Sequence, residues 1–312
     1  MTPFAFVFPG QGSQAVGMLD GWGDHPAVRQ TLDEASAALG EDMRVLIHAG
    51  PKEELDLTTN TQPVMLTAGM ACYRAWLAET GLTPGLVAGH SLGEYTALVA
   101  AGALTLADAL PLVRFRAQAM QEAVPVGVGA MAAILGMDAA AVQAGCVEVA
   151  AASGEVVEAV NFNDPKQTVI AGSKAGVEQA CVVLKAKGAK RALALPVSAP
   201  FHSSLMKPAA ERLRVRLAAT PFAVPAIGVV NNVDVQCETD PQRVRDALYR
   251  QAFAPVRWVE VVHAMRTQGM THVFECGPGK VLAGMVRRID ADAVTATVLD
   301  MESLSEARSL LS

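Results

Sequence analysis

The chain has 312 residues, of which 51% are hydrophobic and 18% are charged, so it can bury a large core in one or two domains. Its net charge of −6 argues against nucleic acid as a partner, and its five cysteines, which form no C-x-x-C pair, argue against a disulfide or zinc framework. No stretch approaches the ~20 apolar residues of a membrane span, and Met1-Thr2-Pro3 lacks the basic start of a signal peptide, so we expect a cytoplasmic protein without membrane contact.

The first segment predicts a buried strand that ends in a glycine-rich loop. Phe4–Phe8 is an apolar run too short for a helix and rich in strand-forming residues. The loop Gly10-Gln11-Gly12-Ser13-Gln14-Ala15 matches the G-x-G-x-x-A pattern of dinucleotide-binding proteins. That fingerprint also needs a second strand that ends in an acidic residue ~20 positions later. Asp33-Glu34 instead lies in the first of two helical patterns, at about 27–39 and 61–79, so we do not expect a nicotinamide cofactor.

The next segment has the pattern of a nucleophile elbow. A short apolar strand, Leu86-Val87-Ala88, leads into Gly89-His90-Ser91-Leu92-Gly93, and an alanine-rich helix follows over 94–101. Glycines on both sides of the serine let the backbone turn sharply without Cβ clashes. Such a turn exposes the serine at a helix N-terminus, where unpaired N–H groups favour developing negative charge. Ser91 is therefore the candidate nucleophile.

A second helix is predicted to start after Thr105, with Thr105 and Asp108 as a capping box. Its apolar residues recur at three- and four-residue steps, and Pro111 is expected to bend it locally. Arg114 and Arg116 flank the apolar stripe about equally, so the helical pattern does not choose between them.

Residues 127–197 have a different rhythm and predict a separate small unit. Strands are predicted over 131–134, 156–162, 168–171 and 192–197, helices over 138–149 and 173–187, and a turn over Asn163–Lys166. The order β-α-β-β-α-β is that of a ferredoxin-like unit, and a continuation of the main sheet is the alternative. We therefore expect an α/β protein: a hydrolase-like core with a mostly parallel sheet, formed by residues 1–126 and 198–312, with an inserted ferredoxin-like subdomain over 127–197.

The α/β pattern resumes after the insertion. Strands are predicted over 227–231 and 272–275, and helices over 255–266 and after Gly277-Pro278-Gly279. The stretch Gly277–Lys280 lacks the upstream glycine of a Walker A loop. The six histidines include no H-E-x-x-H pair, so we expect no metal.

A nucleophilic serine needs a base, and His202 is the best candidate among the histidines. It lies in the loop Ser198–Ser204, which follows a predicted strand and contains a proline, and loops at strand ends often carry chemistry. It also follows Ser91 in the Ser-then-His order of hydrolase folds. His90 adjoins Ser91 but would point elsewhere on an elbow. A buried structural histidine is the alternative for His202.

Together these residues resemble the malonyl-CoA:acyl-carrier-protein transacylases of the stand-alone bacterial type, within the acyltransferase family. The resemblance covers nearly the whole chain and rests on five motifs in matching order and spacing: Phe8–Gln14, Gly89–Tyr95, Arg116 ahead of Met120-Gln121, Phe201-His202-Ser203 and Glu275–Gly279. It implies ping-pong transfer of a malonyl group from coenzyme A to the phosphopantetheine thiol of acyl carrier protein, in fatty acid biosynthesis.

The resemblance also implies a role for each site residue. Ser91 would form the acyl-enzyme, with His202 as general base and then general acid. The backbone N–H groups of Gln11 and Leu92 would form the oxyanion hole, and Leu92 is also what elbow geometry alone predicts. Arg116, rather than Arg114, would bind the malonyl carboxylate in the substrate site.

The group that orients His202 is left open between two candidates. The resemblance implies the main-chain carbonyl of Gln251, a residue of the substrate site. A hydrolase triad would use an acid between the serine and the histidine, and Asp164 is the candidate, although Asn163-Asp164-Pro165 is more typical of a turn.

The implied partners are malonyl-CoA as substrate and an acyl carrier protein, and we expect no other cofactor and a monomer. Carrier proteins are acidic, so docking on this acidic chain needs local basic patches. The candidates are Arg287 and Arg288, and a second group formed by Lys185, Lys187, Lys190 and Arg191.

Three other functions remain as alternatives. The first is a serine esterase or thioesterase on a hydrolase core, and the second is a malonyl transferase subunit of another complex. The third is a non-catalytic subunit that only binds acyl carrier protein, which the presence of both Ser91 and His202 disfavours.

Overall fold

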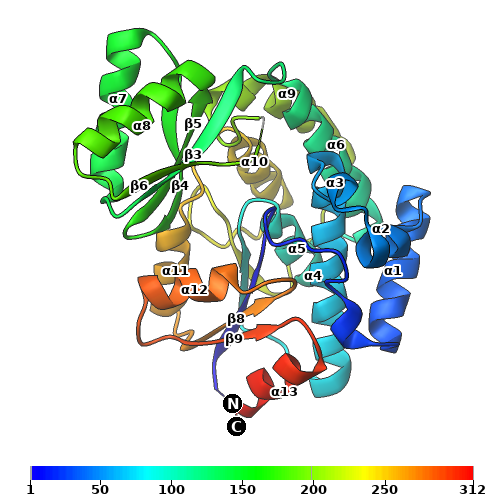
Figure 1. Cartoon of the computed structure of the whole chain (residues 1–312). Helices are drawn as coiled ribbons and strands as arrows, with labels where there is room; N and C mark the ends of the chain where they lie inside the picture. Colours follow the sequence, from blue (N-terminus) through cyan, green and yellow to red (C-terminus); the bar gives the residue numbers. More distant parts are fainter. Residues whose placement is uncertain (1, 198, 312) are drawn as a thin grey trace.

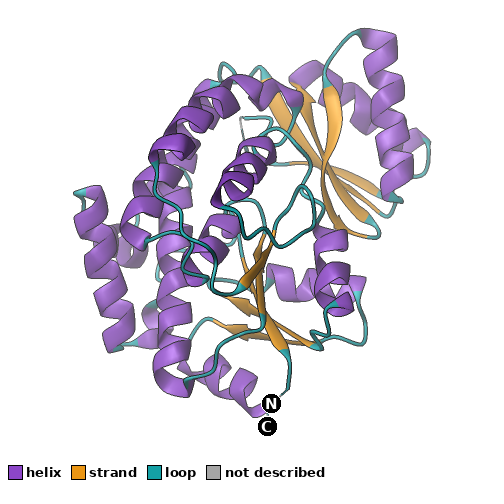
Figure 2. Cartoon of the chain, turned by 180° about the vertical axis from the view of Figure 1, so that it is seen from behind, coloured by secondary structure: helices purple, strands orange, loops and turns teal. Residues whose placement is uncertain are grey.

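The computed structural model describes residues 2–197 and 199–311. Met1 and Ser198, which belong to two segments interpreted above, lie outside the described residues. Figure 1 shows a larger body built around one sheet and a smaller body, coloured green, beside it. Figure 2 shows the strands of the two bodies as separate groups with helices packed around each.

The larger sheet has five strands in the order β7-β2-β1-β8-β9, and every neighbouring pair is parallel. In chain order the strands are β1 (Phe4–Phe8), β2 (Leu86–Gly89), β7 (Gly228–Val230), β8 (His272–Cys276) and β9 (Val294–Val298). Phe6 of the central strand lies opposite Val87 on one side and Phe274 on the other. Because parallel strands all end at the same edge, the loops that follow β1, β2, β7 and β8 gather there.

Helices cover both faces of this sheet, as the alternation along β1 requires. Phe4, Phe6 and Phe8 belong to a core shared with the long helix α4, whose Trp76 ring lies 5.2 Å from that of Phe6. Ala5 and Val7 belong to a second core, which α11 and α12 complete. The helices of the larger body are α1 (Pro26–Leu39), α2 (Met43–Ala49), α3 (Lys52–Leu55), α4 (Thr58–Thr80), α5 (Gly93–Ala100), α6 (Leu106–Glu122), α9 (Lys207–Ala219), α10 (Pro241–Gln251), α11 (Trp258–Thr267), α12 (Val281–Ile289) and α13 (Met301–Ser309).

The smaller sheet is antiparallel and has the order β4-β5-β3-β6. Its elements follow one another as β3 (Gly129–Leu135), α7 (Ala139–Ser153), β4 (Val157–Asp164), β5 (Gln167–Ser173), α8 (Lys174–Ala186) and β6 (Arg191–Ala194). Residues of α7 and α8 share a core with one face of this sheet. The predicted fold class, a hydrolase-like parallel core with an inserted βαββαβ unit, is confirmed. The division at residues 126/127 and 197/198 stays a proposal.

Several boundaries differ from the sequence-based expectation. The last strand of the insertion stops at Ala194 instead of residue 197, and Leu195 and Val197 line a pocket. Helix α11 begins at Trp258 instead of 255, because Val256 exchanges two backbone hydrogen bonds with β4 and thereby links the two bodies. Asn163 and Asp164, expected in a turn, end β4. These boundaries depend on contacts between distant segments, which the local sequence pattern does not show.

Two further details concern helices. Thr105 caps α6 by accepting a hydrogen bond from the Asp108 N–H, but the Asp108 carboxylate accepts from the Thr105 hydroxyl, so the predicted capping box is only half formed. Among the helices of the described residues, none is both long and apolar enough to cross a membrane.

Candidate active site

Ser91 lies on a sharp turn between β2 and α5, at the carboxyl edge of the parallel sheet. Its φ of +53° is a left-handed conformation that non-glycine residues rarely adopt. A Cβ on Gly89 would lie 1.9 Å from the carbonyl carbon of Gly93, and one on Gly93 would lie 2.0 Å from the Phe8 oxygen. Both glycines are therefore required for the turn to close against β1.

His202 contacts Ser91 from a loop more than a hundred positions away in the sequence. Its Nε2 lies 2.7 Å from Ser91 Oγ, and its Nδ1 lies 2.8 Å from the main-chain oxygen of Gln251. A carbonyl oxygen can only accept a hydrogen bond, so Nδ1 carries the proton of the neutral ring and Nε2 is free to accept from the serine hydroxyl. The arrangement is that of a nucleophile and its base.

The surroundings of His202 keep its imidazole neutral. The side chain is only 3% exposed, and burial together with the positive charge of Arg116 lowers its pKa to about 3. Asp164 does not contact the ring: its carboxylate binds the Arg288 guanidinium at 2.7 Å and the Lys166 N–H at 2.8 Å. Of the two candidates for the group that orients His202, the Gln251 carbonyl is therefore the one that contacts the ring.

Arg116 extends from α6 into the same site, whereas Arg114 does not. The Arg116 side chain is 2% exposed and donates to three neutral oxygens: Gln62 Oε1 at 2.8 Å, Gln251 Oε1 at 3.0 Å and Ser91 Oγ at 3.2 Å. Arg114 is half-buried and pairs with Glu41. The helical pattern could not separate these two arginines because it does not show which helix or loop packs beside each of them.

Among the described residues no carboxylate forms a salt bridge with Arg116, and the buried Glu94 acts on its charge only from beyond hydrogen-bond distance. The Arg116 Nε–H is buried without a hydrogen bond, and burial lowers the pKa of the guanidinium. The face of the Tyr95 ring, 5.4 Å away, gives it some electrostatic support. A buried guanidinium with an unused N–H is well suited to bind a carboxylate from outside.

Gln11 and Leu92 lie next to Ser91 in the lining of one pocket, which has a volume of about 130 Å³. Leu92 directly follows the nucleophile, and the Gly10 backbone approaches so closely that a Cβ there would lie 2.6 Å from the His90 oxygen. Within residues 2–197 and 199–311, no hydrogen bond engages the main-chain N–H of Gln11 or Leu92. Both donors are available to an oxyanion.

Residues of the insertion also line the pocket. Met131, Asn161, Leu195 and Val197 line it, together with Gln62 and Met120 from the core. His90 also lines the pocket, but its Nε2 turns to Asn163 Oδ1 at 2.8 Å and not to Ser91. Sequence reasoning missed Gln62 and Asn161, for which the only signal was a polar residue within an apolar helix or strand pattern.

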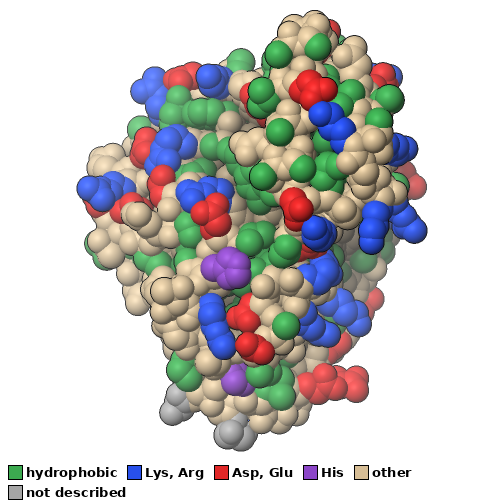
Figure 3. Space-filling view, turned by 90° about the vertical axis from the view of Figure 1, so that its left-hand side faces the viewer, with side chains coloured by type: hydrophobic (Ala, Val, Ile, Leu, Met, Phe, Trp, Pro, Cys, Tyr) green, Lys and Arg blue, Asp and Glu red, His purple; other side chains and the backbone are tan. Residues whose placement is uncertain are grey.

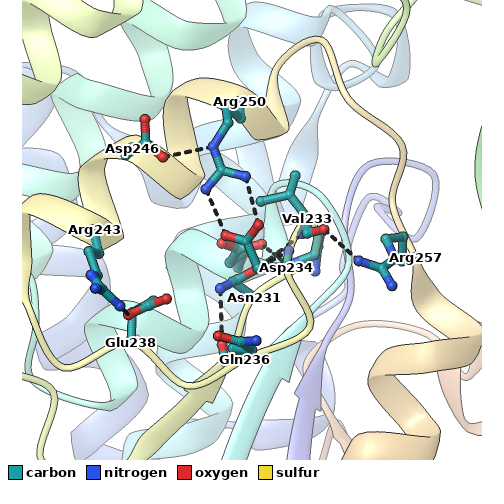
Figure 4. A network of polar contacts seen from close by, with 11 residues as sticks. Asn231, Val233, Asp234, Gln236, Glu238, Arg243, Asp246, Arg250 and Arg257 are labelled. Atoms are coloured by element: carbon teal, nitrogen blue, oxygen red, sulfur yellow. Dashed lines mark hydrogen bonds and ion pairs between the residues drawn. The ribbon is translucent and has the colours of Figure 1, made fainter.

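Asn232 is a further residue that sequence reasoning missed. Its side-chain Oδ1 accepts from the Ser91 N–H at 2.8 Å, and its Nδ2 donates to the Gly89 oxygen at 2.8 Å. The loop that follows β7 carries it, and Figure 4 shows how this loop is held. Arg250 binds both carboxylate oxygens of Asp234, at 2.8 and 2.6 Å, and Arg257 donates to the Val233 oxygen at 2.9 Å.

The predicted docking residues lie outside the pocket. Arg287 and Arg288 are exposed in the last turn of α12, where Arg288 joins α12 to β4 through Asp164 and Arg287 donates to Thr295 Oγ1 at 2.6 Å. Lysine and arginine side chains alternate with acidic ones over the face that includes these elements (Figure 3). Of the second basic group, Lys187 pairs with Glu148, and Lys185, Lys190 and Arg191 are exposed.

Comparisons with a family model, with curated proteins and with solved structures all find acyl transferases. The model of the acyl transferase domain family matches residues 5–301. A malonyl CoA-acyl carrier protein transacylase of Escherichia coli (strain K12) is 55% identical over 308 residues, which cover 98% of this chain and 99% of the relative. An acyl-carrier-protein S-malonyltransferase structure from Burkholderia pseudomallei superposes with a TM-score of 0.97 at 64% identity, covering 99% of this chain and 100% of that one. A type II PKS acyl-carrier protein in complex with its malonyl-transacylase gives a TM-score of 0.97 at 49% identity, with 99% and 100% covered.

Proposed function

Because this chain belongs to the acyl transferase family, we propose that it moves a malonyl group from coenzyme A to the phosphopantetheine thiol of an acyl carrier protein, in fatty acid biosynthesis. The relatives are named for malonyl transfer to acyl carrier protein, and one solved relative is bound to its carrier. Acyl transfer between two thiols needs neither an oxidant nor a metal, so the proposal requires no further cofactor. A cytoplasmic location is part of the proposal.

In the first half-reaction, Ser91 attacks the carbonyl carbon of the malonyl thioester. His202 Nε2, 2.7 Å from Ser91 Oγ, takes the hydroxyl proton as the new C–O bond forms. The oxyanion is stabilised by the N–H groups of Gln11 and Leu92, and removing one such donor typically costs ~3 kcal/mol of transition-state stabilisation. When the C–S bond breaks, the coenzyme A thiolate takes the proton from His202 and leaves malonyl-Ser91.

The second half-reaction runs the same steps with the other thiol. The phosphopantetheine thiol gives its proton to His202 Nε2, and its sulfur attacks the ester carbonyl of malonyl-Ser91. Collapse of the tetrahedral species breaks the C–O bond, and the proton on His202 returns to Ser91 Oγ. The Gln251 carbonyl keeps the ring in the tautomer that both steps need, and it is well placed to stabilise the imidazolium that forms in each.

The observation that carries the choice of malonyl is the unpaired cation in the pocket. Arg116 Nη2 lies 3.2 Å from Ser91 Oγ, and the three hydrogen-bond acceptors of the guanidinium are neutral. A malonyl group on Ser91 has its carboxylate within the same short reach and would supply the missing anion. An esterase acting on uncharged acyl groups would leave the buried Nε–H of this guanidinium without a hydrogen-bond partner, which is costly.

Carrier docking is proposed on the exposed end of α12. Arg287 has no ion-pair partner among the described residues, whereas Arg288 is already paired with Asp164. Arg287 therefore contributes more of the net attraction to an acidic carrier than Arg288 does.

Intact-mass spectrometry after exposure to malonyl-CoA tests the proposed function. The expected result is a malonyl adduct on a single peptide that contains Ser91, lost again when a carrier protein with its phosphopantetheine thiol is added. An adduct that water removes as fast as the carrier does would indicate a thioesterase instead.

A further inference from the structure

A buried carboxylate lies directly beneath the elbow and has no part in the mechanism above. Glu94 is in the first turn of α5 and is only 2% exposed. Its Oε2 accepts two hydrogen bonds, from the Asn232 N–H at 2.9 Å and from Gln251 Nε2 at 2.9 Å. One carboxylate oxygen thus joins two residues that lie far from it in the sequence.

Those two residues contact the proposed nucleophile, its base and the proposed carboxylate-binding cation. The Asn232 side chain binds the Ser91 N–H and the Gly89 oxygen, which are the two sides of the elbow. Gln251 binds the Ser91 oxygen through Nε2 at 3.0 Å, the Arg116 guanidinium through Oε1 and the His202 ring through its main-chain oxygen. Through one intervening residue, Glu94 is thus connected to the nucleophile, to the base and to the carboxylate-binding cation.

We infer that Glu94 is a positioning residue, which fixes Asn232 and Gln251 and through them the relative placement of Ser91, His202 and Arg116. The inference rests on the proposed function, because the roles of those three residues come from that function.

The amide of Gln251 shows why an acceptor is needed at this position. An amide has an oxygen that accepts and a nitrogen that donates, and a half-turn about its last bond exchanges them. Only with Oε1 toward Arg116 can the guanidinium donate to this side chain, and this orientation requires acceptors on the Nε2 side. Glu94 Oε2 and the Ser91 oxygen are those acceptors. Without Glu94, a single acceptor would remain.

What distinguishes Glu94 from another buried carboxylate is the pair of residues that it binds, and not its burial. Burial raises the pKa of Glu94 to about 7, so folding alone would be better served by an apolar side chain. A matched case is Glu275 in β8, which is 0% exposed and has its pKa raised to about 7 by burial. Its carboxylate accepts a hydrogen bond from the Ala283 N–H of α12 and forms none with Ser91, His202 or Arg116.

The test compares Glu94→Ala and Glu94→Gln with Glu275→Ala and Glu275→Gln. For each purified full-length variant, the rate of Ser91 acylation and kcat/KM for malonyl-CoA and acetyl-CoA are measured, together with the thermal midpoint. Because displacement of reacting groups by ~1 Å can cost about 100-fold, we expect Glu94→Ala to lose about 100-fold in acylation rate. We also expect its malonyl-to-acetyl ratio to fall about 10-fold, since Arg116 loses its fixed partner.

Glu94→Gln should recover most of both losses, because the glutamine oxygen can accept the same two hydrogen bonds. The Glu275 variants should lower the thermal midpoint and leave the malonyl-to-acetyl ratio unchanged. A folded Glu94→Ala protein with the wild-type ratio and acylation rate would overturn the inference, as would a Glu94→Gln protein as impaired as Glu94→Ala. If Glu94→Ala does not fold, Glu94→Asp replaces it, because its shorter carboxylate cannot reach both donors. A wild-type ratio and rate in folded Glu94→Asp would equally overturn the inference.

Wild-type protein run in parallel separates the two hypotheses. Absence of a malonyl adduct on wild-type Ser91 would reject the proposed function. A wild-type adduct combined with unimpaired Glu94 variants would reject only the positioning role.

Discussion

The two sheets of this protein contribute to one pocket in different ways. The parallel sheet and its helices supply Ser91, the N–H groups of Gln11 and Leu92, and the Arg116 side chain. The antiparallel unit supplies wall residues such as Met131 and Asn161, and neither of these two forms a hydrogen bond with Ser91 Oγ. The candidate chemical groups therefore come from the larger body, whereas the smaller body adds wall residues only.

The difference follows from strand direction. Parallel strands all end at one edge, so the loops after β1 and β2 bring Gln11 and Ser91 together without further support. Antiparallel neighbours end at opposite edges, so the small sheet offers the pocket a face and not a cluster of loop residues. The comparison teaches that changes in the parallel core should affect acylation and the choice of acyl group. Changes at the junction of the two bodies, where α12 meets β4, should affect only transfer to the carrier protein.

The largest expected effect is at the nucleophile. Ser91→Ala should reduce malonyl adduct formation by at least about 10³-fold, because the chemistry of both half-reactions depends on this hydroxyl. Intact-mass spectrometry measures the adduct, and circular dichroism checks that the fold is retained. An adduct that persists on another residue would contradict the assignment of the chemistry to the parallel core.

Arg116→Ala should change selectivity more than it changes folding. Charge-assisted hydrogen bonds contribute ~1.5–3 kcal/mol each, so the malonyl-to-acetyl ratio of kcat/KM should fall about 10- to 100-fold. The reason is twofold: the variant loses its attraction for malonyl, and acetyl no longer leaves a buried cation unpaired.

Arg114→Ala is the matched control, two positions away on α6 and paired with Glu41 outside the pocket. Its ratio should equal that of the wild type. If Arg114→Ala shifts the ratio and Arg116→Ala does not, the carboxylate site is on the wrong face of α6.

At the junction, Arg287→Glu should slow transfer to the carrier about threefold to tenfold and leave acylation by malonyl-CoA unchanged, because reversing a peripheral charge weakens association and not chemistry. Single-turnover measurement of each half-reaction separates the two. Arg288→Glu is less suitable, since it would place a second carboxylate beside the buried Asp164.

Lys190→Glu combined with Arg191→Glu tests the other basic surface, on the insertion. If this pair slows carrier transfer and Arg287→Glu does not, the carrier docks on the insertion and not on α12. Equal effects on both half-reactions would argue against docking at the altered surface.

The smallest expected effect is on the pH dependence of stability. The pKa of His202 is lowered to about 3 in the native state, so between that value and an unfolded pKa of ~6.5 the unfolded chain binds a proton that the native state does not. Wild-type stability should therefore fall as pH is lowered through this window. His202→Gln should flatten the slope by up to ~1.4 kcal/mol per pH unit, measured by urea unfolding at pH 5, 6 and 7. Parallel slopes would mean that His202 binds protons in the native state as it does in the unfolded chain, which would contradict the lowered pKa.

Local pattern was sufficient for the parts of the fold that depend on neighbouring residues. The strand Phe4–Phe8 was predicted with its observed bounds, and so was the turn around Ser91, because alternation and paired glycines are visible within a few positions. The order of the inserted unit followed from the same kind of evidence. By contrast, α9, α10, β9 and α13 were not predicted, and β6 was predicted too long.

Only the tertiary structure decided which polar groups meet at the site. The His202 ring is bound by the main-chain carbonyl of Gln251, and a carbonyl has no signature in the sequence because every residue has one. Arg116 was distinguished from Arg114 by Gln62 and Gln251, which lie on other helices. Sequence alone predicted the candidate nucleophile Ser91 and the strand and helix on each side of it. Contacts between residues far apart in the chain decided how that serine is held, because they depend on how elements pack and not on how residues follow one another.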